Sequence, residues 1–426
     1  MKNRLNQYID DHKQEIYQLG DALFNSPELG FKEFHTKQII ISYLEDHGLK
    51  VDRTFCQSGL SVRIGSGAPH IGLIAEMDAI PTLGHPCASA TDNAAHACGH
   101  STQMTSMLAA LDAVNQIISD LPGTVTLYFT PAEEFTDMNY RRQAISEGKI
   151  RYASGKQNML VEHIFDEEDL LIHLHACSQT DKYHFSIGSR LAGFIYKRIT
   201  FHGKTAHAAM GPDKGHNALN MCVLFLDAVN MLRETFREED SVRLHGMIDK
   251  GGDTVNSIPS EVVYECYVRT SNFQFLFELN DQIDNVASHC AQALGGSAEI
   301  EDTPGYLPLV QSDELNEVLY PNLLQFYPED QIKHGESSMA AGDVGDIAAF
   351  KPLIQYGYCG IGGNLHGADM YIKDPEEVYI TQAKVLADTV YDLLADPQKV
   401  RKVTEAFKPS MTYDQYIAYL DGKRKG

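Results

Sequence analysis

The sequence has few basic residues and no long apolar run, and these two shortages exclude several kinds of partner. Its 426 residues carry 35 lysines and arginines against 58 aspartates and glutamates, a formal net charge of −23. Nucleic acids and anionic membranes attract clustered positive charge, so neither is expected as a partner. The N-terminal residues lack the apolar core of a signal peptide, and no stretch of about 18 apolar residues suggests a membrane span. We expect a cytoplasmic protein whose acidic surface serves solubility.

A disulfide framework is also missing. The eight cysteines are scattered without regular spacing, which fits a reducing compartment and mostly buried free thiols: Cys56, Cys87, Cys98, Cys177, Cys222, Cys266, Cys290 and Cys359. Among them, Cys98 has polar neighbours that suggest chemistry. The chain is longer than the roughly 250 to 300 residues at which one hydrophobic core stops growing, so two domains are expected.

Residues 71–169 alternate short apolar runs with helical periodicity, which is typical of β-α-β units around a parallel sheet. Strands are predicted at 71–75, 124–130 and 170–174. The first, IGLIA, is almost wholly apolar, as suits a strand covered on both faces. Apolar residues at helical spacing predict a helix that follows His100 and packs on this sheet: Met104, Met107, Leu108, Leu111 and Val114.

A different rhythm begins near residue 189. Strand patterns at 194–201, 242–248, 261–270 and near 297–301 alternate with helical patterns at 219–232 and about 273–293. The order β-α-β-β-α-β is that of a ferredoxin-like unit. Because the first kind of pattern resumes after about Pro304, we expect residues 189–302 to be inserted into a domain formed by 1–188 and 303–426.

Candidate metal ligands follow three successive predicted strands. Asp78 comes after the first strand, with Glu76 close by, Glu134 follows the second, and His175 the third. Ligands in open α/β sheets bind at the carboxyl ends of the strands, so these side chains should meet at one edge.

Cys98 and His100 precede the predicted helix and reach the same edge, where the helix N-terminus should lower the pKa of the Cys98 thiol. One thiolate with imidazoles and carboxylates suits a divalent ion such as zinc, manganese or nickel, and the ligands suffice for two ions.

Glu133 and Glu134 are neighbours, so their side chains diverge and both would not normally chelate one ion. One can bind metal while the other, Glu133, acts as general base on a water whose pKa the metal lowers. Taken from the residues alone, the pair could equally open a solvated helix, and an isolated Cys-x-His pair is more often structural than ligating. The same caution assigns structural or surface roles to His96, His173, His202 and His216.

Seven ordered segments resemble the metal-dependent amidohydrolases that include aminoacylases, hippurate hydrolases, indole-acetyl-amino-acid hydrolases and aminobenzoyl-glutamate hydrolases. They are AEMDAIP (75–81), HACGH (96–100), TPAEE (130–134), IHLHA (172–176), GKTAHAA (203–209), GGDTVNSIP (251–259) and NLHG (364–367). The resemblance implies an α/β metallopeptidase-like catalytic domain with a mixed, mostly parallel sheet and an inserted ferredoxin-like lid and dimerisation domain. It further implies a homodimer with two divalent metal ions per subunit, Mn²⁺ or Zn²⁺, with Ni²⁺ or Co²⁺ as alternatives.

Carried over residue by residue, the resemblance implies Glu133 as general base and Asp78 as an acid that holds ligands in orientation. The implied metal ligands are Cys98, His100, Glu134, His175 and His366. His175 is preferred to His173 because the family's ligand histidine ends its strand after a hydrophobic residue.

In the inserted domain, His207 matches a histidine that the family brings from a dimer partner to polarise the scissile carbonyl. Asn256 and Arg269 match positions that face substrate, where Arg269 would suit a bidentate grip on a carboxylate. A surface ion pair is the alternative for Arg269, which lies on the Glu265 face of its strand.

Two segments depart from the family pattern. Ser101-Thr102-Gln103 follows the CGH motif where the family has Asp and, two residues later, His; Phe135-Thr136-Asp137 follows PAEE where the family has glycines. The segment AAGDVGDIAAF (340–350) resembles the aminobenzoyl-glutamate type.

The resulting hypothesis is metal-dependent hydrolysis of the amide bond of N-acyl or N-aroyl amino acids or small peptides. A catalytically silent metal-binding relative with a ligand-binding or regulatory role is one alternative. Core histidines and cysteines in an α/β enzyme with other chemistry are another.

Overall fold

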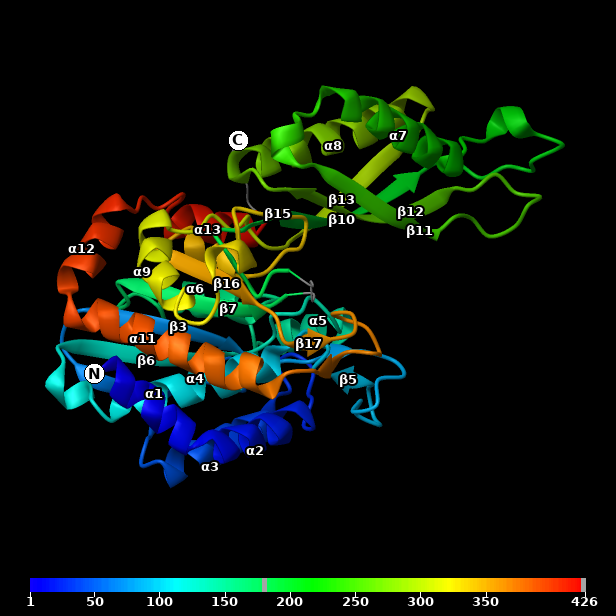
Figure 1. Cartoon of the computed structure of the whole chain (residues 1–426). Coiled ribbons are helices and arrows are strands. Elements are labelled where there is room, and N and C mark those ends of the chain that lie inside the picture. Colours follow the sequence, from blue (N-terminus) through cyan, green and yellow to red (C-terminus); the bar gives the residue numbers. More distant parts are fainter. Residues whose placement is uncertain (178–181, 423–426) are drawn as a thin grey trace. The chain divides into compact units, whose positions relative to one another are not determined.

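A computed structural model of the chain describes residues 1–177 and 182–422 (Figure 1). Its internal contacts divide the chain into two units. Unit 1 contains Met1–Ser189, Val310–Glu336 and Asp346–Thr412. Unit 2 contains Arg190–Leu309, Ser337–Gly345 and the chain from Tyr413 onward.

Unit 1 is built on an eight-stranded sheet in the order β1-β2-β6-β3-β7-β16-β8-β14. The strands are β1 (Val51–Phe55), β2 (Gly59–Ser66), β3 (His70–Glu76), β6 (Gly123–Thr130), β7 (Leu170–Ala176), β8 (Phe185–Ile187), β14 (Ile332–His334) and β16 (Leu353–Tyr358). The central strands β6, β3, β7 and β16 run parallel, whereas β1–β2, β2–β6 and β16–β8 are antiparallel pairs. The expectation of a mixed, mostly parallel sheet is therefore confirmed.

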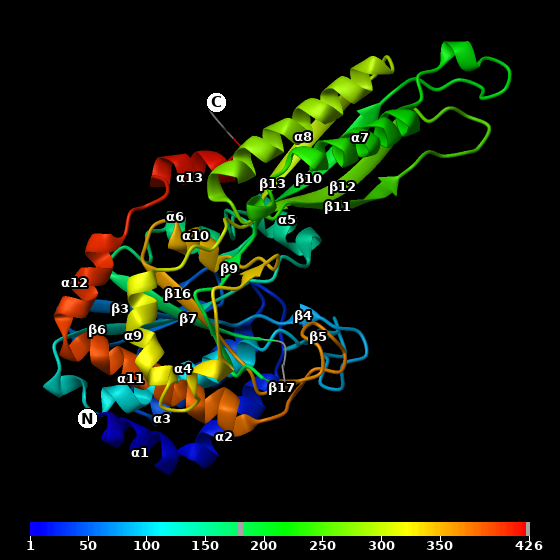
Figure 2. The ribbon, with the colours of Figure 1, turned by 45° about the horizontal axis from the view of Figure 1, so that its top comes forward.

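The central strands are apolar because both of their faces are covered. Helices α4 (His100–Asn115) and α11 (Gln382–Ala395) pack against each other on one face, and α6 (Gly155–Val161) lies on the other (Figures 1 and 2). The sequence predicted one apolar stripe on α4, but every residue from His100 to Val114 is buried. This helix is enclosed on all sides because α1 (Lys2–Asp11) and α2 (Lys13–Phe24) cover it as well.

Shorter elements complete unit 1. They are α3 (Phe34–Asp46), α5 (Met138–Ser146), α9 (Asp313–Leu323), α12 (Pro397–Ala406), the π-helical turn Glu376–Thr381, and the strand pairs β4 (Ile80–Pro81) with β5 (Ala94–Ala95) and β17 (Ile361–Gly362) with β18 (Tyr371–Ile372). Helix α10 (Val344–Ala348) spans the boundary between the units.

Unit 2 has the predicted order of elements. It consists of β10 (Gly193–His202), α7 (Ala218–Leu232), β11 (Arg243–Lys250), β12 (Glu261–Thr270), α8 (Phe273–Ala293) and β13 (Ser297–Pro304), with α13 (Tyr413–Leu420) near the C-terminus. The four strands form an antiparallel sheet in the order β11-β12-β10-β13, and α7 and α8 cover one of its faces (Figure 2). Alternation along β10 and β12 buries one side of the sheet against these helices. Within residues 1–177 and 182–422, no helix combines the length and the apolar character that crossing a membrane requires.

Candidate metal centre

The five predicted ligands lie together in unit 1, beyond the carboxyl ends of the parallel strands. Cys98 Sγ is 3.2 Å from His366 Nε2 and 3.5 Å from His175 Nε2. His366 Nε2 is 3.4 Å from Glu134 Oε1. Two groups that could hold an ion share Cys98, one with His100 and His175 and the other with Glu134 and His366, and the ligand atoms of each group lie within 4.8 Å of one another. We call these five residues the ligand cluster.

Backbone acceptors aim two of the imidazoles at the ligand cluster. The Nδ1 atoms of His100 and His175 lie 2.8 Å from the carbonyl oxygens of Asp78 and Ala176, to which they donate. Each Nε2 is then left to bind a cation, an arrangement usual for metal-ligating histidines.

Two buried atoms of the ligand cluster form no hydrogen bond of good geometry, although each faces a polar group. His100 Nε2 lies 3.2 Å from Glu76 Oε2, and Glu134 Oε1 lies 3.4 Å from His366 Nε2. Burying polar atoms without good hydrogen bonds costs free energy, which a bound cation would offset. A donor set of sulfur, nitrogen and oxygen atoms is one that suits a borderline divalent metal.

The adjacent carboxylates of Glu133 and Glu134 diverge, as their spacing predicted. Glu134 joins Cys98 and His366, whereas Glu133 joins His100 and Glu76 in a third group of the same kind, with its Oε2 3.8 Å from His100 Nε2. Glu133 thus lies beside both ligand groups, which suits a base acting on water near a metal ion.

Asp78 is fully buried and fixes the backbone of both glutamates. Its Oδ1 accepts the N–H of Glu133 at 3.1 Å, and its Oδ2 accepts the N–H of Glu134 at 2.9 Å. The same carboxylate lies 3.4 Å from His100 Nδ1. Its contacts therefore fit the orienting role that the resemblance implied.

Behind His100, the buried carboxylate of Glu76 has several polar partners. Its Oε1 is 2.7 Å from Lys156 Nζ and 3.3 Å from His173 Nε2, and its Oε2 accepts a bond of 2.9 Å from Gln103 Nε2. Burial, the largest influence, raises the pKa of Glu76, but Lys156 and the imidazoles of His173 and His100 outweigh it and hold the pKa well below its usual range. His173 therefore belongs to this network and to none of the three ligand groups found among the described residues.

The departure at Ser101-Thr102-Gln103 has a local explanation. The amide oxygen of Gln103 accepts the N–H of Glu76 at 3.1 Å while its nitrogen donates to the Glu76 carboxylate. Thr102 Oγ1 donates to the Gly99 carbonyl at 2.7 Å and also contacts Tyr358. These residues support the ligand cluster with partners other than the usual Asp and His.

The expected depression of the Cys98 pKa is wrong for the protein without a cation. Burial, followed by the carboxylates of Glu134 and Glu133, raises the pKa of the Cys98 thiol well above its usual value. Helix α4 begins after Gly99, but its N-terminal dipole is a smaller effect than two buried negative charges. A cation in the ligand cluster would be needed to hold the thiolate at neutral pH.

The pKa values of His175 and His100, which belong to one ligand group, are shifted in opposite directions. Burial lowers the pKa of His175 to about 4, so its imidazole is neutral and can ligate at neutral pH. Burial, the largest influence, also lowers the pKa of His100, but the carboxylates of Glu76 and Asp78 outweigh it and raise the pKa to about 9. A cation would have to displace the proton of His100.

The side chain of Arg141 packs beside Phe135, the large residue that follows Glu134. This fully buried side chain donates to the carbonyl oxygens of Glu134 and, at 2.6 Å, Ala153. Its guanidinium lies 6.0 Å from the ring centre of Phe135 and 5.5 Å from that of Phe31. Phe135 therefore packs against a side chain that also holds the Glu134 backbone.

His207 and Asn256 lie together on exposed loops of unit 2. His207 Nδ1 accepts the N–H groups of Met210 at 3.1 Å and Ala209 at 3.3 Å, and its Nε2 is 3.3 Å from Asn256 Nδ2. A further bond of 3.0 Å runs from Ala208 N to Asn256 O. Because Nδ1 accepts two N–H groups, a neutral ring carries its proton on Nε2, and this tautomer pairs with Asn256 when the amide of Asn256 presents its oxygen.

Arg269 makes no surface ion pair. Its Nη1 donates to the Met339 carbonyl at 3.1 Å, and its guanidinium stacks 5.0 Å from Tyr267 and 5.3 Å from Phe194. Among the residues that the structure describes, no carboxylate lies within 4 Å of it. Stacked guanidinium groups of this kind keep donors for a planar anion.

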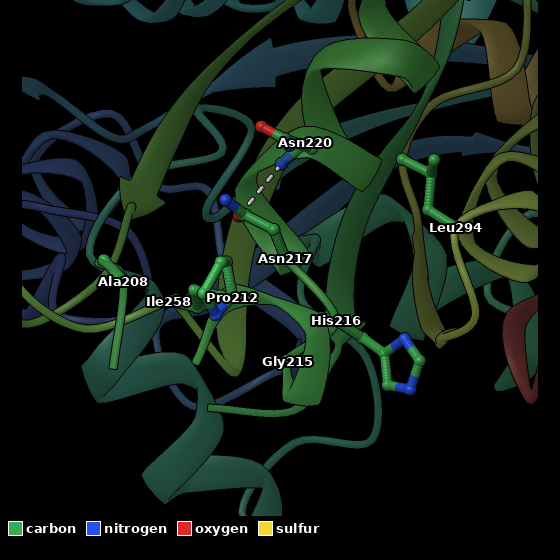
Figure 3. Close-up of a pocket in the computed structure, with 8 residues that line it drawn as sticks. All are labelled: Ala208, Pro212, Gly215, His216, Asn217, Asn220, Ile258 and Leu294. Carbon is green, nitrogen blue, oxygen red and sulfur yellow. Dashed lines mark hydrogen bonds between the residues drawn. The ribbon is translucent and has the colours of Figure 1, made fainter. Parts of the chain in front are cut away.

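A pocket of about 450 Å³ opens in unit 2 beside the loop of His207 (Figure 3). It is lined by Ala208, Pro212, Gly215, His216, Asn217, Asn220, Ile258 and Leu294. The Asn217 side chain is already engaged, because it caps α7 by accepting the N–H groups of Leu219 and Asn220. No predicted ligand lines this pocket, so the ligand cluster of unit 1 is the candidate centre.

Three polar side chains around the site were not found from the sequence. Lys156 and Arg141 occur in short helices where a cation is usually solvated, and Glu33 precedes a helix, where an acidic residue usually acts as a cap. The contacts of Lys156 and Glu33 depend on the packing of distant segments, and the bond of Arg141 to Glu134 depends on the local path of the chain. For Gln103 a signal existed, since it lies in the segment that departs from the family pattern.

Comparisons with known proteins agree with this geometry. The model of peptidase family M20/M25/M40 matches residues 72–392, well over half of the chain. The human Xaa-Arg dipeptidase is 24% identical over 98% of this chain and 94% of its own length, and one component of the Escherichia coli p-aminobenzoyl-glutamate hydrolase is 25% identical over 75% of this chain and 65% of its own. A dinuclear metal-binding peptidase of the M20 family from Bacillus subtilis superposes with a TM-score of 0.71 at 19% identity, covering 91% of this chain and 99% of its own. The chain therefore belongs to peptidase family M20/M25/M40 and is a hydrolase.

Proposed function

We propose that the protein is a metal-dependent amidohydrolase that cleaves the amide bond of N-acyl or N-aroyl amino acids or of small peptides. The observation that carries this proposal is the pair of ligand groups that share Cys98, with the Glu133 carboxylate beside them. The buried His100 Nε2 and Glu134 Oε1 form no hydrogen bond of good geometry, which supports a bound cation beside them.

Cys98, His100 and His175 would hold one divalent ion, and Cys98, Glu134 and His366 a second. The similarity to a dinuclear metal-binding peptidase supports two metal ions per subunit. The mixed donor set favours Mn²⁺ or Zn²⁺, with Ni²⁺ or Co²⁺ also compatible. Ions bound there would polarise the scissile carbonyl and lower the pKa of a water molecule.

Glu133 performs the proton transfers. Its carboxylate takes a proton from the water that attacks the carbonyl carbon, and the resulting carboxylic acid gives that proton to the nitrogen as the C–N bond breaks. Asp78 keeps Glu133 in place through its bond to the Glu133 N–H. The products are a carboxylic acid and a free amine.

His207 would donate its Nε2–H to the carbonyl oxygen, where negative charge develops. Asn256 lies beside this ring, and Arg269 has no carboxylate partner among the described residues, which suits a grip on the carboxylate of an amino-acid product. The substrates named for the two relatives, a dipeptide with C-terminal arginine and an aroyl amino acid, both carry such a carboxylate.

We infer a homodimer in which His207 serves the site of the partner subunit. Strand β11 is an edge of its sheet and leaves backbone groups unpaired, with Met247 59% and Ile248 42% exposed. Met231 on the nearby helix α7 is 72% exposed. A second copy of the chain would cover these apolar groups. The free cysteines support a cytoplasmic location.

The test is Glu133→Gln, assayed with N-acetyl and N-benzoyl amino acids, p-aminobenzoyl-glutamate and dipeptides ending in arginine. We expect turnover to fall at least about 10³-fold because a catalytic base is removed, with the metal content unchanged. Glu317→Gln, on the exposed surface of α9, is the matched control.

Unchanged turnover in Glu133→Gln would refute the assignment of the base. Stoichiometric metal in a wild-type protein that hydrolyses nothing in the panel would instead identify a silent metal-binding relative. Elemental analysis of protein purified without chelators gives the number and identity of the ions.

A further inference from the structure

Three successive backbone N–H groups, those of residues 132–134, point at two buried carboxylates. The N–H groups of Glu133 and Glu134 bond to Asp78, as described above. The N–H of Ala132 donates to Glu33 Oε1 at 2.9 Å. Glu33 is therefore the second anchor of the segment that carries the proposed base.

Ala132 has a backbone conformation that needs support. Its φ is +55°, in the left-handed region that non-glycine residues rarely adopt because the Cβ atom approaches the following carbonyl oxygen. The conformation turns the chain between the end of β6 at Thr130 and Glu133. A bond from the Ala132 N–H to a fixed carboxylate offsets part of this steric cost and holds the turn.

Both oxygens of Glu33 are committed, although the residue is fully buried. Oε2 accepts a bond of 2.5 Å from Ser58 Oγ, and Oε1 accepts the Ala132 N–H. Glu33 stands at the start of α3, but its side chain makes no bond to the first turn of that helix. Capping therefore does not explain this buried acid.

We propose that Glu33 is a positioning residue for the reaction: by fixing the backbone of Ala132 it sets the direction in which the neighbouring Glu133 carboxylate points. The inference rests on the proposed function. Glu33 can act on Glu133 closely because Ala132, whose N–H it binds, directly precedes Glu133 in the chain. A displacement of about 1 Å at a reacting group costs up to roughly 100-fold in rate.

Glu28, on the loop that leads into α3, offers a matched control. Its carboxylate accepts the N–H groups of His35 at 3.1 Å and Thr36 at 2.8 Å, so it caps the helix and does not contact residues 132–134. If the local fold around α3 were all that mattered, removing either acid would have the same effect.

The experiment compares Glu33→Ala, Glu33→Gln and Glu28→Gln by kcat, KM, metal content and Tm. We expect Glu33→Ala to lower kcat about 10-fold or more, with KM and metal content within about twofold of wild type. Glu33→Gln should recover most of the loss, because an amide oxygen can still accept the Ala132 N–H. Glu28→Gln should keep the wild-type kcat.

A second measurement is independent of turnover. In metal-free protein, the Ala132 amide should exchange with solvent about 10-fold faster in Glu33→Ala than in wild type, and at the wild-type rate in Glu28→Gln. If Glu33→Ala does not fold, Ser58→Ala loosens the same carboxylate and should raise the exchange rate to a smaller extent.

Equal kcat and equal exchange in folded Glu33→Ala and wild type would overturn the proposal, as would equal losses in Glu33→Ala and Glu33→Gln. A wild-type protein without turnover would be a failure of the proposed function instead. The exchange rates would then decide alone whether Glu33 holds this backbone.

Discussion

The ligand cluster of unit 1 and the His207 loop of unit 2 are built in opposite ways. In the ligand cluster, His100 and His175 are fixed by carbonyl acceptors, and Asp78 fixes the backbone of both glutamates. His207 and Asn256 are exposed, and their main partners are each other and nearby backbone groups. The proposed metal ligands are thus preorganised, whereas His207, the residue proposed to polarise the carbonyl, lies on an exposed loop.

The largest effect on activity should come from the substitution of a proposed metal ligand. Glu134→Ala should remove one of two ions and lower kcat/KM at least about 10³-fold, since a bound metal contributes several kcal/mol to catalysis. Elemental analysis with steady-state assays checks this, with Glu317→Ala as control. Two ions retained at full occupancy would show that Glu134 is not a ligand, and the comparison between the regions would fail.

The second largest effect should come from Lys156→Met, which should lower the stability of the protein. It leaves the buried Glu76 carboxylate without its main counter-charge, a change that typically costs about 3 to 5 kcal/mol. Thermal melts should show a marked loss, and the double variant Lys156→Met/Glu76→Gln should regain part of it. A double variant no better than the single one would contradict this pairing.

His207→Ala should lower kcat about 100-fold by removing one donor to the carbonyl oxygen. Its metal content and Tm should stay at the wild-type values, because the residue is exposed. Mixing it with Glu133→Gln protein should restore some activity if His207 acts in the partner's site. Confirmed mixed dimers without recovery would place the site within one chain.

The smallest effect concerns His47 at the surface of unit 1. Burial, the largest influence, lowers its pKa, but bonds to Glu15 and Asp112 at 2.9 and 2.6 Å outweigh it and raise the pKa overall. A raised pKa means stability that is full below the unfolded pKa near 6.5 and is lost as pH rises through the folded value.

His47→Gln should therefore destabilise the protein more at pH 6 than at pH 9, by no more than about 1 kcal/mol in the free energy of unfolding, and the drop in Tm should be larger at pH 6. Tyr43→Phe, beside the same imidazole, is the matched control because it removes no charge at either pH. A deficit that does not depend on pH would show that the ring contributes packing alone.

The sequence predicted different features of unit 1 and of unit 2. The strands that end at Glu76, Thr130 and Ala176 could be predicted because each is a short, mostly apolar segment, and the ligands beyond them follow from the rule for parallel sheets. The element order of unit 2 followed from alternation and helical spacing. Family resemblance was needed for His366, which lies on a loop without periodicity.

Asp78 was assigned its supporting role from the resemblance, but three other supporting polar residues could not be predicted. Glu33 and Lys156 take part because the fold brings segments far apart in the chain into contact, whereas Arg141 reaches the nearby Glu134 carbonyl through a local path of the chain that no periodic pattern records. The error over the Cys98 pKa has the same origin. The helix start is visible in the sequence, whereas the burial that raises the pKa of the thiol most, and the carboxylates of Glu134 and Glu133 that add to it, depend on the folded structure.

The pairing of β16 with β7 fixes when this site can exist during synthesis. These neighbouring strands are separated in the chain by the whole of β10 to β13, and His366 follows β16. A ribosome that has made Cys98, Glu134 and His175 must still translate all of that insertion before the last ligand emerges. Binding of both proposed ions can therefore be complete only after the insertion has been translated, and a chain cut short before His366 would lack one of the proposed ligands.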